Sequence, residues 1–380
     1  MTATIARKRK SSGIAMPRVD LLHALATVSA AVPTRTPKPI LHNVLLHDGM
    51  LTATNLELRI DCDIDYHDDP LLLPHARLTA ILRESKAEEV TLTRDGEACI
   101  VKIGRSEWRL PVEDASEFPA WEPEAAKPLP ILPVDQFCRA VRSVSYACDD
   151  DTSRYALGAV LFEVSRSEGK CWVVASDGRR LSVATMALPN SRDVDDSKTL
   201  VPHSSIAAIQ RVADQHKSDG SGIDLTASKS EIVAKLDGQR VIARLVSGDF
   251  VPWRDLFKDR EATEQVVAID HLLSATRAAA IVTTEESKGV DYLFSDGELT
   301  LKARSSENGE SRVECEVAEF DSPAAVRLDP RFVSDVLGAL STLDGEPTVR
   351  IELAGSGDAV VFLYGGDDEY RSVIMPLAKD

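Results

Sequence analysis

Residues 74–85 read PHARLTAILRES, and two later stretches repeat their pattern. Residues 202–214 read PHSSIAAIQRVAD and residues 330–340 read PRFVSDVLGAL, so the prolines lie 128 residues apart, from 74 to 202 and from 202 to 330. Apolar residues three and four apart follow each proline, which is the spacing of a helix that buries one face. Proline is tolerated at the first helical position, where its missing N–H needs no partner. We therefore predict three such helices, each starting at its proline, in three copies of one unit.

An earlier helix is predicted in each unit, over residues 19–32, 134–147 and 269–282. Each of these begins with a hydrophobic residue, Asp, any residue and then Leu or Phe, and the Asp is predicted to be the N-cap. Alternating apolar and polar residues predict strands between the two helices of a unit, and a hairpin after the second. The fold class predicted for each unit is α+β, with two helices packed on antiparallel sheets.

The 380 residues are enough for two or three domains. Proline-rich and charged connectors near 117–131 and 250–265 divide the repeats. The predicted organisation is a flexible tail over 1–15 and three domains over 16–128, 129–258 and 259–380. The tail holds a basic cluster, and two interpretations stay open: contact with DNA phosphates, or solubility alone.

Charge and cysteine usage limit the classes of protein. The chain has 44 Lys and Arg against 61 Asp and Glu, a net charge of −17, which excludes a uniformly basic nucleic-acid coat but not a basic stripe on an acidic body. Six cysteines without CxxC spacing predict reduced, buried thiols in a cytoplasmic protein rather than a disulfide scaffold. No apolar stretch is long enough for a membrane helix, so no membrane partner is expected.

Motifs of catalysis are missing from the sequence. The eight histidines form no HExxH, and there is no GxSxG or GxxxxGK[ST]. His75 and His203 occupy matching positions after their prolines, which indicates a structural role at a helix start. Asp61, Asp63 and Asp65 alternate along a predicted strand without the pattern of a calcium loop. We predict no metal, no cofactor and no enzymatic activity, with a metal-dependent hydrolase as the enzyme alternative.

Several motifs resemble the bacterial β sliding clamp family, the processivity factors of replicative DNA polymerases, and the resemblance covers residues 16–380. They are 32–46 (VPTRTPKPILHNVLL), 51–60 (LTATNLELRI), 175–184 (ASDGRRLSVA), 245–257 (LVSGDFVPWRDLF) and 370–377 (YRSVIMPL). The resemblance implies that each chain is a crescent of three DNA-clamp domains, and that two chains close a head-to-tail homodimeric ring around duplex DNA. Implied partners are double-stranded DNA bound non-specifically, the polymerase catalytic subunit, the clamp loader and other proteins with clamp-binding motifs.

A ring that slides must hold DNA through its phosphates without reading bases. The helices supply arginines for such a surface: Arg18, Arg77, Arg83, Arg139, Arg142, Arg211, Arg277 and Arg331. Arg83 and Arg211 both lie nine residues after their unit's proline, so we expect them to point the same way. The resemblance adds Arg35, Arg154 and Tyr155 to the DNA-binding set. The alternative for the helical arginines is that they are ordinary solvated surface charges.

The resemblance also implies a pocket that binds short peptides, between the second and third domains. Its predicted residues are Leu157 (or its neighbour Ala156), Ser176, Gly178, Arg179, Arg180, Leu181, Pro252, Leu256, Val373, Met375, Pro376 and Leu377. Methionine adapts its shape to apolar ligand side chains, which suits such a site. The alternatives are a simple hairpin turn at Asp177-Gly178 and a packed strand end at Met375-Pro376.

Ring closure requires a sheet edge at each end of the chain, because an exposed edge is a liability unless it is paired. By resemblance, the strand through 103–110 would pair with 312–317 of the other chain. The predicted interface residues are Ile103, Arg105, Glu107, Trp108, Ile281, Val282, Val313 and Cys315. Departures from the family pattern at Arg179, Asp255 and Ala378 leave a second function open: a clamp-fold peptide-binding scaffold that does not retain DNA.

Overall fold

The computed structural model describes residues 13–149, 156–188, 195–258, 261–343, 345, 347–366 and 369–378. Contacts divide the chain into two compact units, and each is described by itself. The first holds residues up to 127 together with 211–244, and the second holds 128–210 together with 245–380. These two compact units differ from the three repeats of the sequence analysis, because each unit contains residues of more than one predicted domain. The boundaries of the three domains therefore remain a prediction.

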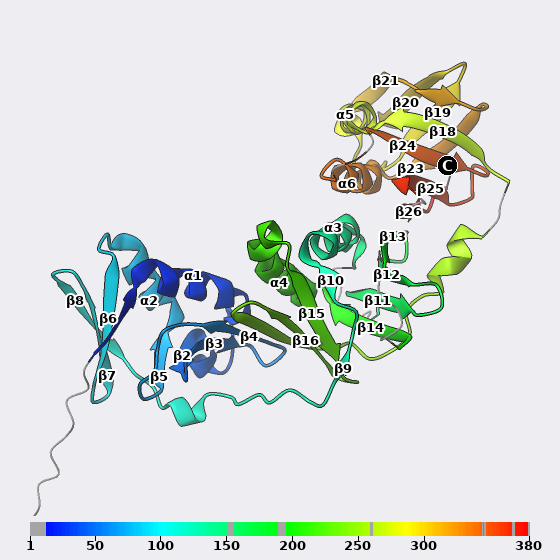
Figure 1. Cartoon of the computed structure of the whole chain (residues 1–380). Helices are drawn as coiled ribbons and strands as arrows, with labels where there is room; N and C mark the ends of the chain where they lie inside the picture. The colour runs from blue at the N-terminus through cyan, green and yellow to red at the C-terminus, as the bar shows by residue number, and fades with distance from the viewer. Residues whose placement is uncertain are drawn as a thin grey trace, which may run out of the picture. The chain divides into compact units, whose positions relative to one another are not determined.

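The first unit contains two antiparallel sheets (Figure 1). One has the strand order β1 (Ile14–Pro17), β6 (Glu89–Asp95), β7 (Ala98–Ile103), β8 (Ser106–Pro111). The other runs β15 (Gly222–Ala227), β16 (Glu231–Leu236), β17 (Gln239–Arg244), β4 (Leu58–Asp63), β3 (Met50–Thr54), β2 (Asn43–His47), β5 (Leu71–Pro74). The pairing of β17 with β4, with Val241 opposite Ile60, makes one continuous sheet from two of the repeats.

The second unit also contains two sheets. The longer has the order β14 (Ser197–Pro202), β11 (Ala159–Ser165), β12 (Lys170–Ser176), β13 (Arg180–Ala187), β26 (Tyr370–Ile374), β25 (Val360–Tyr364), β24 (Thr348–Leu353), β18 (Thr263–Ala268), β22 (Glu319–Phe320). The shorter runs β21 (Gly309–Glu316), β20 (Glu298–Ser305), β19 (Val290–Ser295), β23 (Ala324–Leu328). Here β13 and β26 join two repeats, with Leu181 opposite Val373.

Two helices are present in each repeat. They are α1 (Arg18–Val28), α2 (His75–Glu84), α3 (Val134–Val144), α4 (His203–Ala213), α5 (Ile269–Ala279) and α6 (Pro330–Leu340). The predicted periodicity places the core: Leu78 and Leu82 of α2, and Val333 and Leu337 of α6, are buried. Within their units α1 packs on α2, and α5 packs on α6. The short strands β9 (Lys127–Pro128) and β10 (Leu132–Pro133) complete the chain's strands in the described residues.

Two predictions about the helix starts are wrong. Only Pro330 is the first residue of its helix, with the Asp329 side chain capping the N–H of Arg331. Pro74 and Pro202 are instead the last residues of β5 and β14, where the ladder continues through them opposite Asn43 and Ala159. An extended proline ending a strand needs no donor on that side, so the helix begins one residue later.

The aspartates of the first helices are not N-caps. Asp20, Asp135 and Asp270 lie inside the first turn, and no side chain caps these three helices. At two of these helices a backbone carbonyl of another segment accepts from the first N–H: Arg18 N donates to Glu88 O at 2.7 Å, and Ile269 N donates to Pro347 O at 2.9 Å. An acidic side chain in the first turn still stabilises the helix through its dipole.

Candidate functional site

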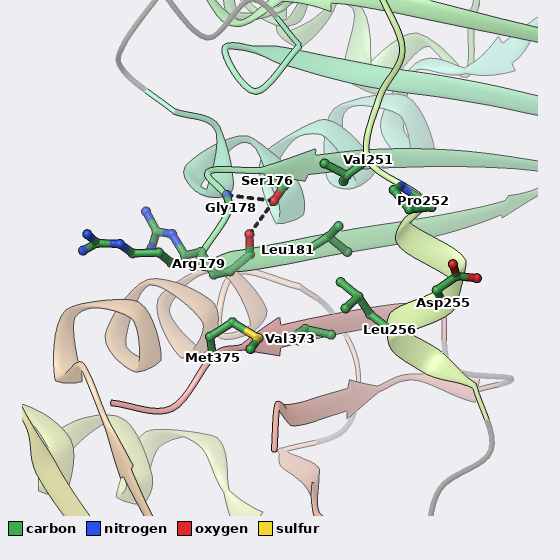
Figure 2. A pocket seen from close by; sticks show the side chains of 11 residues that line it. Ser176, Gly178, Arg179, Leu181, Val251, Pro252, Asp255, Leu256, Val373 and Met375 are labelled. Atoms are coloured by element: carbon green, nitrogen blue, oxygen red, sulfur yellow. Dashed lines mark hydrogen bonds between the residues drawn. The ribbon is translucent and has the colours of Figure 1, made fainter. Parts of the chain in front are cut away.

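A mostly apolar pocket of about 260 Å³ lies beside the seam between β13 and β26 (Figure 2). Leu181 and Val373, which are paired across the seam, and Val251 are among its lining residues. Within the described part of the chain, its lining residues are Ser176, Gly178, Arg179, Arg180, Leu181, Val251, Pro252, Asp255, Leu256, Val373 and Met375. Leu256 is 38% exposed and Met375 is 43% exposed, so the pocket presents apolar side chains directly to solvent. Apolar side chains that are exposed beside a pocket can be covered by the apolar groups of a ligand.

A tight turn after β12 shapes one end of the pocket. Gly178 has φ 85°, a left-handed conformation that suits glycine, and its N–H donates to Ser176 Oγ at 3.1 Å. The Asp177 carboxylate accepts hydrogen bonds from the N–H groups of Arg179 and Arg180 at 2.9 and 3.0 Å. The Met375 N–H donates to Arg179 O at 2.9 Å, which ties the C-terminal segment to the turn. The turn is therefore a rigid edge rather than a loose hairpin loop.

Arg180 is the central polar residue of the pocket. Its guanidinium is mostly buried and donates to Asp177 Oδ2 at 2.9 Å, to Tyr146 O at 2.7 Å and to the Asp335 carboxylate. It also lies over the ring of Phe332 at 4.5 Å from the centroid. Arg180 thus joins the turn, the segment after α3 and the helix α6, so the two repeats meet at one fixed geometry behind the pocket.

The opposite wall is the short 3₁₀ helix η7 (Trp253–Phe257). Its Trp253 is buried in the core and donates from Nε1 to Glu163 Oε2 at 2.9 Å. Arg254 lies over the rings of Trp172 and Trp253 and pairs with Glu163 at 2.8 Å. Burial alone would raise the pKa of Glu163, but the hydrogen bonds from Trp253, Arg254 and Lys198 outweigh it and lower the pKa below its usual value. Because its neighbours are anchored, Leu256 is held facing the pocket.

The structure brings together nine of the predicted pocket residues: Ser176, Gly178, Arg179, Arg180, Leu181, Pro252, Leu256, Val373 and Met375. Leu157 is adjacent to the pocket: its Cδ1 lies 3.7 Å from the point where a side chain at Gly178 would place its Cβ. Pro376 and Leu377 are not among the lining residues. The Leu377 N–H donates instead to Arg327 O at 2.8 Å, which directs this residue toward β23. Val251 and Asp255 also line the pocket, and the sequence analysis did not name them as pocket residues. Their position in the 245–257 motif was the available signal.

The predicted DNA-binding arginines fall into two groups. Among the described residues, the exposed ones without a hydrogen-bond or ion-pair partner are Arg35, Arg77, Arg83, Arg211 and Arg277. Arg83, Arg211 and Arg277 lie in the last turns of α2, α4 and α5. Arg154 and Tyr155 lie outside the described residues. The first group can offer its full charge to phosphates.

The remaining helical arginines are engaged within the protein. Arg331 pairs with Asp329 at 2.9 Å and with Glu285 at 3.4 Å, and the hydrogen bond with Asp329 raises its pKa. Arg139 pairs with Asp135 at 3.3 Å, and Arg142 is half-buried with an interaction partner. Arg18 donates to Leu82 O and Ala87 O, both at 2.9 Å, and so satisfies a carbonyl at the end of α2.

The residues predicted for ring closure lie on or beside two sheet edges. β8 is the edge of one sheet in the first unit, and β21 is the edge of the shorter sheet in the second. Glu107 and Trp108 lie on β8, Val313 and Cys315 lie on β21, and Ile103 ends the neighbouring β7. Arg105 is exposed in the turn before β8. Ile281 in the 3₁₀ helix η8 (Ala280–Val282), which contacts β21, is 78% exposed, and Val282 is half-buried.

The described residues offer no metal site and no membrane-spanning helix. No group of three His, Cys, Asp or Glu side chains there is placed to hold a metal ion. No helix there is both long and apolar enough to cross a membrane. The six cysteines are buried and reduced, and burial raises the thiol pKa of Cys62 and Cys99 to about 11 and that of Cys171 to about 12.

Comparisons with known proteins identify the family. Models of the DNA polymerase III beta subunit match three successive parts of the chain: the N-terminal domain at residues 13–122, the central domain at 131–252 and the C-terminal domain at 254–378. The chain belongs to the DNA polymerase III beta subunit family, the β sliding clamps. A beta sliding clamp of Caulobacter vibrioides is 25% identical over 376 residues, which cover 96% of this chain and 99% of the relative. That of Escherichia coli K12 is 26% identical over 372 residues, covering 95% and 98%.

Solved structures of β sliding clamps share the fold. A DNA polymerase sliding clamp from Pseudomonas aeruginosa, crystallised with a ligand, superposes with a TM-score of 0.87 at 24% identity, covering 97% of this chain and all of the other. The DNA polymerase III beta subunit of Thermotoga maritima gives a TM-score of 0.87 at 19% identity, with 97% of this chain covered. The α+β class with antiparallel sheets and three clamp repeats is thus confirmed for this member of the β clamp family.

Proposed function

We propose that this chain is a DNA sliding clamp. Two copies close head to tail into a ring that encircles duplex DNA, slides without reading its sequence, and tethers the replicative DNA polymerase. The observation that carries the proposal is the succession of the three beta-subunit domain models, in family order, over residues 13–378. In this function the protein is an accessory factor with no reaction of its own and acts in the cytoplasm.

The helical arginines support a sliding surface. Arg83 and Arg211 occupy the same position in two repeats, are exposed, and have no partner among the described residues. Arg77 and Arg277 add further exposed charges on α2 and α5. In a chain of net charge −17, such sites concentrate positive potential where the rest of the surface repels DNA. We therefore place Arg77, Arg83, Arg211 and Arg277 on the inner face of the ring, and Arg35 near the DNA.

Two edge strands support ring closure. β8 of one chain would pair with β21 of the other, which would satisfy the unpaired backbone groups of both edges. Ile281, exposed beside β21, would be buried in the same junction. Because the chain supplies one edge of each kind, head-to-tail pairing of two copies leaves neither edge open.

The apolar pocket provides the tether. Its size, about 260 Å³, falls below the ~300–1,000 Å³ of sites for drug-sized ligands, so it suits a few apolar side chains of a short peptide rather than a folded surface. We propose that the polymerase catalytic subunit, the clamp loader and other clamp-binding proteins each insert such a peptide between Leu256 and Met375.

Retention on circular DNA tests the function. The full chain, loaded on a nicked plasmid by a clamp loader, should remain bound through gel filtration in salt and dissociate once the plasmid is linearised. Arg83→Glu with Arg211→Glu should weaken retention, while Arg166→Glu, at an exposed arginine in the turn after β11 and on none of the six helices, should not. Retention that is absent on circles, or equal on circles and linear DNA, contradicts a sliding ring.

A clamp-fold peptide-binding scaffold is the second candidate. Two ion pairs within the protein favour it: Arg331 pairs with Asp329, and Arg139 pairs with Asp135. These pairs remove two predicted charges from the DNA-binding set. The scaffold predicts peptide binding together with loss of retention on circles, and a solution mass near the 41.3 kDa monomer. The clamp predicts about twice that mass, stable on dilution.

A further inference from the structure

The charged residues at the rim of the pocket are not equivalent to one another. Three of the lining residues carry charges: Arg179, Arg180 and Asp255. A ligand that enters the pocket meets only those charges that the protein has not already paired. The charge pattern therefore bears on which peptides bind, an inference that rests on the proposed peptide-binding function.

Arg180 and Asp255 are already paired within the protein. The Arg180 guanidinium is mostly buried and engaged by Asp177, Asp335 and the Tyr146 carbonyl. The Asp255 carboxylate pairs with Lys258 Nζ at 2.8 Å, one helical turn further along the chain. Neither group offers an unpaired charge to an incoming peptide.

Arg179 differs from both. Its side chain is exposed, and among the residues that the structure describes no acceptor or carboxylate pairs with its guanidinium. Its backbone is nevertheless fixed on both sides, because its N–H donates to Asp177 Oδ1 at 2.9 Å and its carbonyl accepts from Met375 N at 2.9 Å. A free cation is thus mounted on a rigid edge of an apolar pocket.

The two ends of the pocket therefore differ in charge. Figure 2 shows Arg179 beside Met375 at one end and Asp255 on η7 at the other, with Leu181, Val373 and Leu256 between them. A peptide whose apolar side chains fill the middle, and whose chain leaves the pocket over the Met375 end, places a neighbouring residue beside Arg179. A carboxylate there gains an ion pair with no competing internal partner, whereas a lysine there meets a like charge.

We propose that this pocket selects peptides that carry an acidic residue directly beside their apolar anchors, on the flank that faces Arg179. Arg179 is the specificity-determining residue for that position. Apolar contacts supply the affinity, and the Arg179 ion pair fixes which peptides are preferred and the direction in which they lie.

Fluorescence anisotropy with the full chain tests the proposal. The probes are labelled ten-residue peptides with Leu and Phe anchors and Ser elsewhere, carrying Glu, Gln or Lys directly before or directly after the anchors. In one of the two placements, Glu should bind about two- to fivefold more tightly than Gln, and Lys more weakly than Gln, as expected for an exposed ion pair. The difference should shrink in 0.5 M NaCl, where exposed charges are screened.

Charge exchange identifies the residue. Arg179→Glu should invert the order, so that the Lys peptide binds more tightly than the Glu peptide, and Arg166→Glu should leave the order unchanged. An order that survives Arg179→Glu overturns the proposal. Equal binding of all peptides to the unmodified chain overturns the charge selection but leaves the peptide-binding function standing. No binding of any peptide overturns both.

Discussion

Replacing Arg180 by methionine should lower the free energy of unfolding where two repeats meet, and it should also lower the affinity of the pocket for peptides. Methionine keeps an apolar stem of similar length over Phe332 but removes all guanidinium hydrogen bonds. The Tyr146 carbonyl and Asp177 Oδ2 lose their donor in a partly buried place, whereas Asp335 is 45% exposed on its side chain and regains water. Hydrogen bonds to charged groups contribute ~1.5–3 kcal/mol and exposed ion pairs ~0.2–1 kcal/mol.

The expected loss is therefore about 2–4 kcal/mol in the free energy of unfolding of the second unit. Urea unfolding followed by tryptophan fluorescence is suited to this measurement, because Trp172 and Trp253 lie in that unit's core. Peptide affinity should fall at least tenfold in the same variant, since Arg180 positions the turn that forms one edge of the pocket. Asp335→Asn is the matched control, with a change below about 1 kcal/mol. An Arg180→Met chain as stable as the unmodified one would refute the role assigned to this residue.

Three further predictions concern buried charges and thiols. Asp61→Ala should lower the stability of the first unit by about 3–5 kcal/mol in urea unfolding, because Arg59, at 2.8 Å and nearly buried, is left without its carboxylate. The pKa of Glu163 is lowered in the native chain, so its contribution to stability is complete above its unfolded pKa of about 4.3 and is lost as pH falls through the native pKa. Glu163→Gln should therefore reduce the fall in the free energy of unfolding that is measured between pH 5 and pH 3. Cys62 and Cys99, with pKa values of about 11, should resist a thiol reagent at pH 8 in the native chain and react on unfolding, and rapid native labelling would contradict their burial.

The repeat spacing predicted the architecture because it reflects packing that each unit repeats. Apolar residues three and four apart can bury one face only in a helix, and Leu78 and Leu337 are fully buried as this requires. The helix starts were less predictable. Whether a proline begins a helix or ends a strand depends on a partner strand, and Asn43 opposite Pro74 is 31 positions away in the chain, beyond any local pattern.

The pocket was predicted from motifs, but its support could not be. Ser176 to Leu181 and Leu256 lie in short stretches that resemble the family, so their residues could be named from the sequence. The wall of the pocket is held by the hydrogen bond from Trp253 to Glu163, and the turn is held by the hydrogen bond from Arg180 to Asp335. In each pair the two residues are far apart in the sequence, and no single motif contains both. Residue type also could not reveal that Arg331 is paired while Arg83 is free, since both are arginines on helices.

This difference in pairing explains how an acidic chain can reserve a few charges for recognition. An arginine that already holds carboxylates, like Arg180 or Arg331, contributes to the fold, and exchanging those partners for a ligand would gain little. An arginine on a fixed backbone with no partner among the described residues, like Arg179, has no internal ion pair to give up when a ligand carboxylate arrives. The same reasoning supports our proposals that Arg83 and Arg211 bind DNA and that Arg179 binds a peptide, because an unpaired cation can form a new ion pair without breaking an old one.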